Sequence, residues 1–455
     1  MVQVAENAVI KSTDTHLAKF EQRFESEAAR PSWLFPLRKA GIARFAEKGF
    51  PTLHDEDWRF TNVAPIAKLP FRPVFKSSNA GLTPESVSGF TFGSLPGMRL
   101  VFINGLFDES LSSLSNLPEG VTVSSLARAL STRPALVEKQ FGRRLQTEEN
   151  AFAALNSAFF LDGGYVHVPA GKVLETPVHL LFIATTKENG STSHPRNLLV
   201  VDDHAQATVI ESYVSTVDGA YVTNAVTEII AGEGAVLEHC KLQDESLSAY
   251  HVASIHASLA KGSNVVAHSF AAGARLSRNS IRTHLGGEGV ECVLNGLYLT
   301  KGDQLADHHM VVEHAEPHCN SHEYFNGILD GRSRGVFHGR ILVRQAAQKT
   351  DAKQTNKNLL LSEDAGVDTK PQLEIYADDV KCTHGATIGQ LNDESIFYLR
   401  ARGIGAETAR RMLIHAFAGE IIERIRHSAT REVLDKIVWD RLEANPLIAE
   451  PNQHV

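Results

Sequence analysis

The sequence predicts a mainly β protein, a solenoid of short strands with a helical region at each end. Helical periodicity disappears near Gly163, and short runs of Val, Ile, Leu and Thr punctuated by glycine follow for about two hundred residues. Within that stretch a unit made of a turn and a strand recurs at a nearly constant step. Such a recurrence is typical of solenoids, in which each coil buries its apolar face against the next coil.

The recurrent unit contains strands and no helix. It appears in the segments DDHAQATVIE (202–211), AGEGAVLEHC (231–240), AKGSNVVAHS (260–269), GGEGVECVLN (286–295) and DGRSRGVFHG (330–339). Aligning Ala205, Gly234, Ser263 and Gly289 gives steps of 29, 29 and 26 residues, and the next step, to Gly335, is longer at 46. Repeats made only of strands favour a β-helix over leucine-rich or helical repeats. A β-sandwich is the alternative, although it would not require a regular step.

We expect three regions along the chain. Residues 1–160 form a mainly helical region with a short strand segment, residues 161–390 form the β-helix core, and residues 391–455 form a second helical region. The patterns behind the first region are helical spacing over 13–48 and 123–156 and a strand-like run over 98–104.

The C-terminal region begins at Asn392, a predicted N-cap residue followed by two acidic residues. Residues 406–427 and 431–444 then predict two amphipathic helices. The apolar stripe of the first helix can face a partner, so we expect this helix pair to bind another protein. The residues expected at that contact are Met412, Leu413, Phe417, Arg410 and Glu420. An ordinary cap on the end of the solenoid is the alternative.

The composition argues against some classes of partner. Lys and Arg number 45, Asp and Glu number 53, and the net charge is −8 with no dense basic run, so no nucleic-acid partner is expected. The four cysteines show neither CxxC spacing nor a secreted framework, which fits a reducing cytosol. No segment has the pattern of a signal peptide or the length of a membrane span. We therefore expect a cytoplasmic protein that does not enter a membrane.

A strand-like run at the end of the solenoid carries a cysteine and a histidine. With a period of two, Cys382 and His384 point to the same side, with Cα atoms about 6.6 Å apart. A thiolate and an imidazole at this spacing can share one soft metal ion or sulfur species. A tetrahedral metal site uses about four ligands, so the others would come from other strands, another chain or sulfide. The alternative is a buried Cys and a hydrogen-bonded core His.

Two other polar clusters have structural interpretations. Asp55, Glu56 and Asp57 precede Trp58, and we interpret this segment as an acidic turn with an anchoring Trp, with catalytic or metal-binding carboxylates as the alternative. The histidine-rich segment 307–325 matches no familiar closed metal site, so we interpret it as a polar ladder along the coils.

Enzymatic functions find little support. No GxxxxGK[ST], GxSxG or HExxH motif occurs, which leaves phosphate binding and serine hydrolysis unsupported. The rival functions are a carbohydrate-active β-helix enzyme and a stand-alone metal-binding protein. The former would place clustered Asp, Lys or Arg residues on one exposed sheet, and the sequence shows no such constellation.

One long segment resembles a known family. The run KTDAKQTNKNLLLSEDAGVDTKPQLEIYADDVKCTHGATIGQLNDESIFYLRARG (349–403) strongly resembles the SufB/SufD family of iron–sulfur cluster assembly proteins, and PTLHDEDWRFTN (51–62) is similar to its N-terminal signature. CTHGAT (382–387) resembles the SufD branch, because the SufB branch typically carries a His-Glu pair followed by Ala-Thr-Thr. His338 departs from the family, in which an Asn is expected.

The resemblance implies a right-handed parallel β-helix with helical regions at both ends. It also implies a scaffold subunit that is not itself an enzyme, pairs with a SufB-type paralogue and binds a SufC-type ABC ATPase through the C-terminal helices. Cys382 and His384 match the family's Cys-x-His at the junction with the paralogue, where a transient iron–sulfur cluster is assembled. No cofactor is expected to stay bound to the isolated chain. An unpaired strand edge predicts a homodimer when the paralogue is missing.

Overall fold

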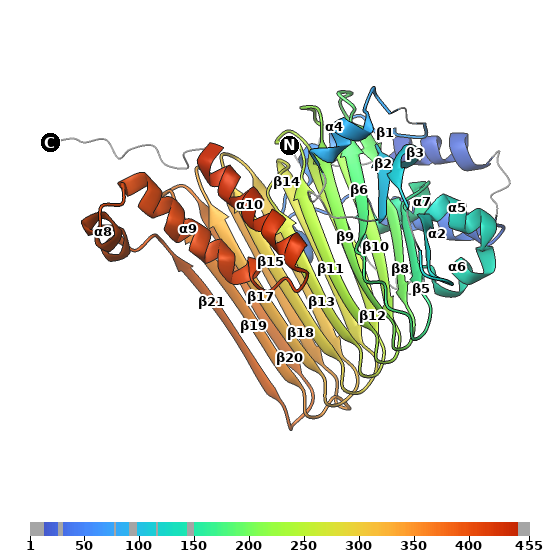
Figure 1. Cartoon of the computed structure of the whole chain (residues 1–455). Coiled ribbons are helices and arrows are strands. Elements are labelled where there is room, and N and C mark those ends of the chain that lie inside the picture. The colour runs from blue at the N-terminus through green and yellow to red at the C-terminus, as the bar shows by residue number, and fades with distance from the viewer. Residues whose placement is uncertain are drawn as a thin grey trace.

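The computed structural model describes residues 13–25, 31–76, 79–90, 98–114, 117–142 and 150–444. The outer ends of the two predicted helical regions, residues 1–12 and 445–455, lie outside this described part. Strands lie side by side in two long sheets, and the N-terminal helices gather at one end of the strand array (Figure 1). Helices α9 (Ala406–Ile422) and α10 (Ser428–Ala444) lie across one face of the array, and α8 (Asp393–Ala401) lies beyond its other end (Figure 1).

The chain alternates between the two sheets from one strand to the next. Sheet A has eleven strands, which are β20 (Gly366–Ile375), β18 (Arg334–Val343), β16 (Leu305–His314), β14 (Leu276–Leu285), β12 (Tyr250–Leu259), β10 (Val222–Ala231), β8 (Arg196–Val201), β5 (Gly164–Val168) and β4 (Thr122–Ser125), with β7 (Ser191–Ser193) and β1 (Arg72–Pro73) beside them. Sheet B has ten strands, which are β21 (Lys381–Gly389), β19 (Asp351–Leu360), β17 (Asn320–Leu329), β15 (Glu291–Thr300), β13 (Asn264–Ala271), β11 (Val236–Asp244), β9 (Gln206–Ser215), β6 (Val178–Ala184), β2 (Met98–Ile103) and β3 (Leu106–Ser113). From β5 onward every pairing is parallel, which confirms the predicted β-solenoid.

The register gives the length of each coil. In sheet B, Val236 pairs with Asn264, 28 residues further on, and Asn264 pairs with Glu291, 27 residues further on. The predicted step is confirmed, but the long step of 46 residues to Gly335 is wrong. Gly335 lies on β18 in sheet A, and the next coil of sheet B begins at Asn320, which pairs with Glu291.

The turns help to explain why the sequence pattern did not reveal the coil that begins at Asn320. The residue two positions before a sheet B strand has a positive φ, at Gly234 (62°), Gly262 (63°), Gly289 (71°), His318 (59°) and Lys349 (61°). Glycine takes this left-handed conformation without steric cost, so it marks most of the turns. His204 (56°), His318 and Lys349 take the same conformation without being glycine, and the strands that follow His318 and Lys349 also begin with polar runs, NSHE (320–323) and DAKQ (351–354), so their coils lack the apolar strand pattern of the others.

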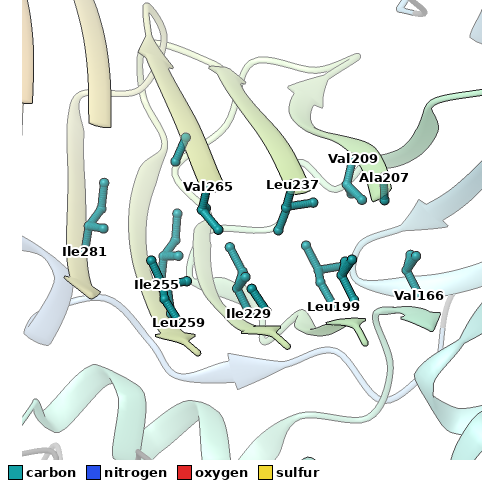
Figure 2. Packing of buried hydrophobic residues seen from close by; sticks show 14 of the residues in the cluster. Val166, Leu199, Ala207, Val209, Ile229, Leu237, Ile255, Leu259, Val265 and Ile281 are labelled. Atoms are coloured by element: carbon teal, nitrogen blue, oxygen red, sulfur yellow. The ribbon is translucent and has the colours of Figure 1, made fainter. Parts of the chain in front are cut away.

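Apolar side chains from both sheets fill the interior. Figure 2 shows Val209, Leu237 and Val265 of sheet B facing Leu199, Ile229 and Ile255 of sheet A. Because equivalent positions repeat from coil to coil, each coil covers the apolar face of its neighbour.

One layer of the same interior is charged. Lys241 Nζ lies 2.9 Å from His251 Nε2, and His251 Nδ1 lies 2.7 Å from a carboxylate oxygen of Glu245. Glu211 lies 2.9 Å from His239 Nε2, and all five residues are buried. Burial lowers the pKa of Lys241 to about 8, although Glu211 and Glu245 oppose that shift. Buried charges of this kind are tolerated only when opposite charges and hydrogen bonds compensate them.

Helices cover the outside of the solenoid. The N-terminal segment contains a helix over 13–20, η1 (Glu21–Glu25), α2 (Leu34–Lys48), η2 (Glu56–Trp58), α3 (Ala64–Ala67), α4 (Pro84–Ser88), α5 (Leu126–Thr132), α6 (Pro134–Gln140) and α7 (Ala151–Phe159). The C-terminal segment contains α8 (Asp393–Ala401), α9 (Ala406–Ile422) and α10 (Ser428–Ala444), of which α9 and α10 pack on sheet B. Within the described ranges, no helix combines the length and apolar character needed to cross a bilayer.

Candidate functional site

The solenoid ends in two free strand edges. β20 and β21 are the last strands of sheets A and B, and no described strand pairs with their outer edges. We call the surface that they form the open end. Ile375, Tyr376 and Ile388 expose 40%, 62% and 52% of their surface there. A strand edge that is neither paired nor covered can accept a strand from another chain.

Cys382 and His384 lie on β21 and face the solenoid axis. The parallel register pairs Cys382 with Ala352 and His384 with Gln354, and both of these β19 residues are buried. In-register residues of parallel strands project to the same face. The two side chains therefore share the inward face of the last strand, as expected from the period of two.

The two side chains differ in exposure. His384 is exposed because no further coil covers β21, so the alternative that it is a buried core histidine is wrong. Cys382 is half-buried and packs beside Leu373 and Val380 at the rim of an apolar cluster. A second chain or an exogenous ligand can reach both groups from the open end.

The Cys382 thiol is not activated by this chain. Partial burial raises its pKa, the Asp351 carboxylate raises it further, and a hydrogen bond involving the backbone of Ala352 opposes the shift only in part. A thiol with a raised pKa is a weak nucleophile, but a metal ion binds the thiolate and displaces the proton. Ligation at Cys382 therefore depends on a metal or a cationic group brought from outside.

Two polar residues lie beneath His384 in the adjacent coils. Gln354 Nε2 donates a hydrogen bond of 2.7 Å to Glu323 Oε2, and both residues are buried. The register runs from Glu323 to Gln354 and then to His384. Burial raises the pKa of Glu323 to about 7, and the hydrogen bond from Gln354 opposes that shift. The sequence did not predict this pair, because Glu323 lies in the coil of β17, which the repeat pattern did not reveal.

The structure separates the five residues predicted for partner binding. Phe417 is half-buried against sheet B, and Glu420 forms an ion pair with Lys357 Nζ over 2.7 Å. Met412 exposes 39% of its surface, whereas Leu413 and Arg410 are half-buried. The buried face of α9 consists of Ala409, Ile414, Ala418, Ile421 and Ile422. The residues that α9 buries therefore lie about one position along the sequence from those of the predicted apolar stripe, for example Ile414 beside Leu413.

Helix α8 presents an apolar surface that the sequence analysis did not single out. None of its residues is buried, and Phe397 and Tyr398 expose 73% and 56% of their surface. Asn392 caps the helix by accepting a hydrogen bond from the Ser395 amide over 3.1 Å, as predicted. Figure 1 shows α8 beyond β21, at the end of the strand array. The sequence signal for this exposed surface was the pair of adjacent aromatic residues, Phe397 and Tyr398, in a short helix without a second apolar stripe.

Trp58 of the acidic turn and His308 and His314 of the histidine-rich segment have structural roles. Trp58 is buried, and the Arg278 guanidinium lies 3.7 Å from the centre of its ring, which confirms the anchored acidic turn. In the histidine-rich segment, His308 and His314 are buried and lie within hydrogen-bond distance of Ser269 and Ser321, at 3.3 and 2.7 Å.

The fold and the open end define the class, a parallel β-solenoid whose last strand presents a thiol and an imidazole. Residues 182–417 match the family model described as "SUF system FeS cluster assembly, SufBD core domain", and residues 11–180 match "SufBD protein N-terminal region". The chain belongs to the SufBD family, the family indicated by its sequence motifs.

Three relatives show the extent of the similarity. An iron–sulfur cluster assembly SufBD family protein of Synechocystis is 34% identical over 90% of this chain and 92% of its own length. The iron–sulfur cluster assembly protein SufD of Escherichia coli is 32% identical over 96% of this chain and 99% of its own length. SufD of Bacillus subtilis is 24% identical over 92% of this chain and 96% of its own length.

Proposed function

We propose that this chain is a scaffold subunit of the SUF system whose open end pairs with a SufB-type solenoid. In this proposal Cys382 and His384 supply part of the ligand set for a nascent iron–sulfur cluster, which is cargo and not a resident cofactor. One observation carries the proposal: an exposed imidazole and a reachable thiol share one face of the last strand, whose outer edge is unpaired among the described residues. Two ligands leave a metal or cluster incomplete, so the partner chain and sulfide supply the others.

The open end suits a paralogous solenoid as a partner. The free edges of β20 and β21 can continue both sheets into a second chain, and the exposed Ile375, Tyr376 and Ile388 would be covered by that contact. The chain's role is then to hold ligands in a fixed geometry. No step of this role requires a nucleophile or a general base of the chain itself.

An ATPase partner fits the exposed surface of α8 and α9. Phe397, Tyr398 and Met412 offer apolar side chains, and we include Leu413 and Arg410 at the edge of the same surface. Phe417 and Glu420 support the packing of α9 on sheet B and act on docking only through the position of the helix. A SufC-type ABC ATPase is the partner that we assign to this surface.

The first experiment replaces His384 in the complete assembly. His384→Ala should leave the melting temperature and the subunit assembly unchanged, because the side chain is exposed, while anaerobic cluster reconstitution falls at least about tenfold. His322→Ala is the matched control, since His322 is a partly exposed histidine of sheet B that faces away from the axis. Normal cluster yield in the His384 variant would refute the proposed half-site.

The second experiment tests ATPase docking with point variants. Deletion of residues 404–455 is unsuitable, because α9 and α10 cover Ile210, Leu242 and Phe270 of sheet B, and the remaining core would expose them. Phe397→Glu and Met412→Glu should instead weaken co-purification of the ATPase without lowering the melting temperature. Glu432→Ala on the exposed side of α10 is the control. Undiminished binding by both variants would place the ATPase elsewhere.

A further inference from the structure

Two histidines stand side by side on the outer face of sheet A, far along the chain from Cys382. His309 on β16 pairs in register with His338 on β18, and their ring centres lie 4.2 Å apart at an interplanar angle of 77°. Because the interior of the solenoid takes His308 and Phe337, the alternation of the strands turns His309 and His338 outward. Both are nearly buried, with 5% and 7% of their surface exposed.

A carboxylate approaches this pair from the N-terminal segment. Asp57 belongs to η2, which the buried Trp58 anchors against Arg278 of β14, and Asp57 Oδ1 lies 3.6 Å from His309 Nε2. One ligand atom from each of Asp57, His309 and His338 falls within 4.8 Å of the other two. A distance of 3.6 Å is too long for a good hydrogen bond but suits two atoms that share a metal ion, whose bonds to such ligands are about 2.1 Å.

The neighbouring cations do not prevent a metal from binding here. Arg278 forms an ion pair with Asp307, Arg340 lies 3.5 Å from Glu374, and Lys370 lies 2.7 Å from Glu56. Each of these three positive charges therefore has its own carboxylate, whereas Arg282 lies 4.0 Å from Oδ2 of Asp57, so that only Oδ1 of Asp57 faces His309.

Room for further ligands exists beside the three residues. A cavity of about 380 Å³ is lined by Asp57 and His309, and its other lining residues include Trp58, Arg278, Ser280 and Arg282. A metal held by three protein ligands keeps open positions, and water or a small anion can occupy those that face this cavity. Arg278 and Arg282 would favour an anion there.

We propose that Asp57, His309 and His338 form a binding site for a divalent first-row transition metal ion, separate from the open end. Two imidazoles and one carboxylate are the donor set that proteins use for ferrous iron and for zinc with open positions. A hydrogen bond that orients one of these imidazoles is present as well, because His338 Nε2 lies 2.7 Å from Gln372 Oε1 and can donate to it. That bond leaves Nδ1 of His338 as the ligand atom.

A second group of metal-binding residue types has a structural explanation. Glu238, Cys240 and His268 also lie close together, but the Glu238 carboxylate accepts hydrogen bonds from the backbone amides of Arg426 and His427, at 2.6 and 3.1 Å. These amides lie just before α10, so Glu238 serves to hold the start of that helix. Within the described residues, the side chains of Asp57, His309 and His338 hold no backbone amide in this way.

Cobalt(II) provides a direct test with the full-length chain. After treatment with a chelator, titration with Co²⁺ under anaerobic conditions should give saturable visible d–d absorption at one equivalent in the Cys382→Ser/His384→Ala double variant, which lacks the proposed half-site. His338→Asn should weaken this binding at least about a hundredfold, and Asp57→Asn should weaken it as well. Fe²⁺ should compete with Co²⁺ for the site.

Controls make the outcomes distinguishable. His284→Asn removes another outward histidine of sheet A, which pairs with Glu313 over 3.0 Å and has no second histidine beside it, and should leave Co²⁺ binding unchanged. Circular dichroism of each variant shows whether it is folded. Absence of Co²⁺ binding in the folded double variant, or binding that survives His338→Asn, would overturn the metal site. Neither result would affect the half-site at Cys382 and His384.

Discussion

Gln354 donates a hydrogen bond of 2.7 Å to the buried carboxylate of Glu323, and the two residues form the floor beneath the open end. Within the described residues, Oε1 of Gln354 has no hydrogen-bond partner. β21 brings His384 into register with Gln354, so the imidazole N–H can donate to this oxygen. Such a contact fixes which ring nitrogen keeps its lone pair for a ligand. The Glu323 carboxylate, the Gln354 amide and the His384 imidazole would then form one chain of hydrogen bonds across three coils.

The raised pKa of Glu323 predicts a pH-dependent stability. Its carboxyl has a folded pKa of about 7, against a usual value of 4.5, so the native state binds the proton more tightly than the unfolded chain. The contribution of Glu323 to the free energy of unfolding should therefore fall between about pH 4.5 and 7, by up to roughly 3 kcal/mol, and stay low at higher pH. Buried histidines with lowered pKa values, such as His179 and His256, act in the opposite direction, so the contribution is the difference between the wild type and Glu323→Gln. Glu323→Gln should abolish this decline. Urea unfolding at pH 5 and pH 8 measures it, and parallel pH profiles of the two proteins would contradict the assignment.

Gly339 provides the space that Gln354 occupies. A Cβ atom at position 339 would overlap the side-chain amide of Gln354 from the opposite sheet. Gly339→Ala should push Gln354 away from Glu323 and lower the free energy of unfolding by about 1–3 kcal/mol. Gly385→Ala is the control, because no atom lies within 4 Å of its Cβ position. Equal urea midpoints for the two variants would show that Gln354 can move without loss.

Lys241 compensates two buried carboxylates in the charged layer. Lys241→Met keeps the volume but leaves Glu211 and Glu245 without their shared cation, and we expect a loss of about 3–5 kcal/mol. Lys261→Met, at an exposed turn, should change the free energy of unfolding by less than about 0.5 kcal/mol. Chemical denaturation compares them. A stable Lys241→Met protein would mean that protonated carboxyl groups replace the ion pairs at no cost.

The free edge of β21 predicts self-association of the isolated chain. Ile388 exposes 52% of its surface on this edge strand, and pairing of two open ends would cover it. Ile388→Lys should shift the chain toward monomer in sedimentation velocity at micromolar concentration, because a buried lysine opposes strand pairing. Asn264→Lys, on a central strand of the same sheet, serves as the control. A wild-type chain that is strictly monomeric would contradict the prediction.

The solenoid could be predicted because its signal is local. Glycine turns at Gly234, Gly262 and Gly289 and the loss of helical spacing both follow from backbone conformation, which the sequence displays directly. The coil at His318 could not be predicted, since its turn lacks a glycine and its strand also begins with the polar run NSHE (320–323).

The candidate site was predictable only in part. Cys382 and His384 are neighbours in one strand, so the period of two was enough to place them together. Glu323, Gln354 and Gly339 meet only through stacking of separate coils, and an error of one coil in the register hides them. The inner face of α9 was misplaced for a related reason. Both Leu413 and Ile414 lie on apolar stripes of the helix, and only sheet B decides which one is buried.

The number of stacked coils also determines the length of the solenoid. Each coil adds one strand to each sheet, and neighbouring strands lie about 4.8 Å apart. Removing one complete coil between two equivalent turns would move the open end toward the N-terminal helices by about that distance and leave its surface chemistry intact. The number of coils therefore fixes the spacing between anything held at the N-terminal helices and anything held at β21. In an assembly of several subunits, a change in the number of coils would change the distance between the groups held at the two ends and leave the surfaces of both ends unchanged.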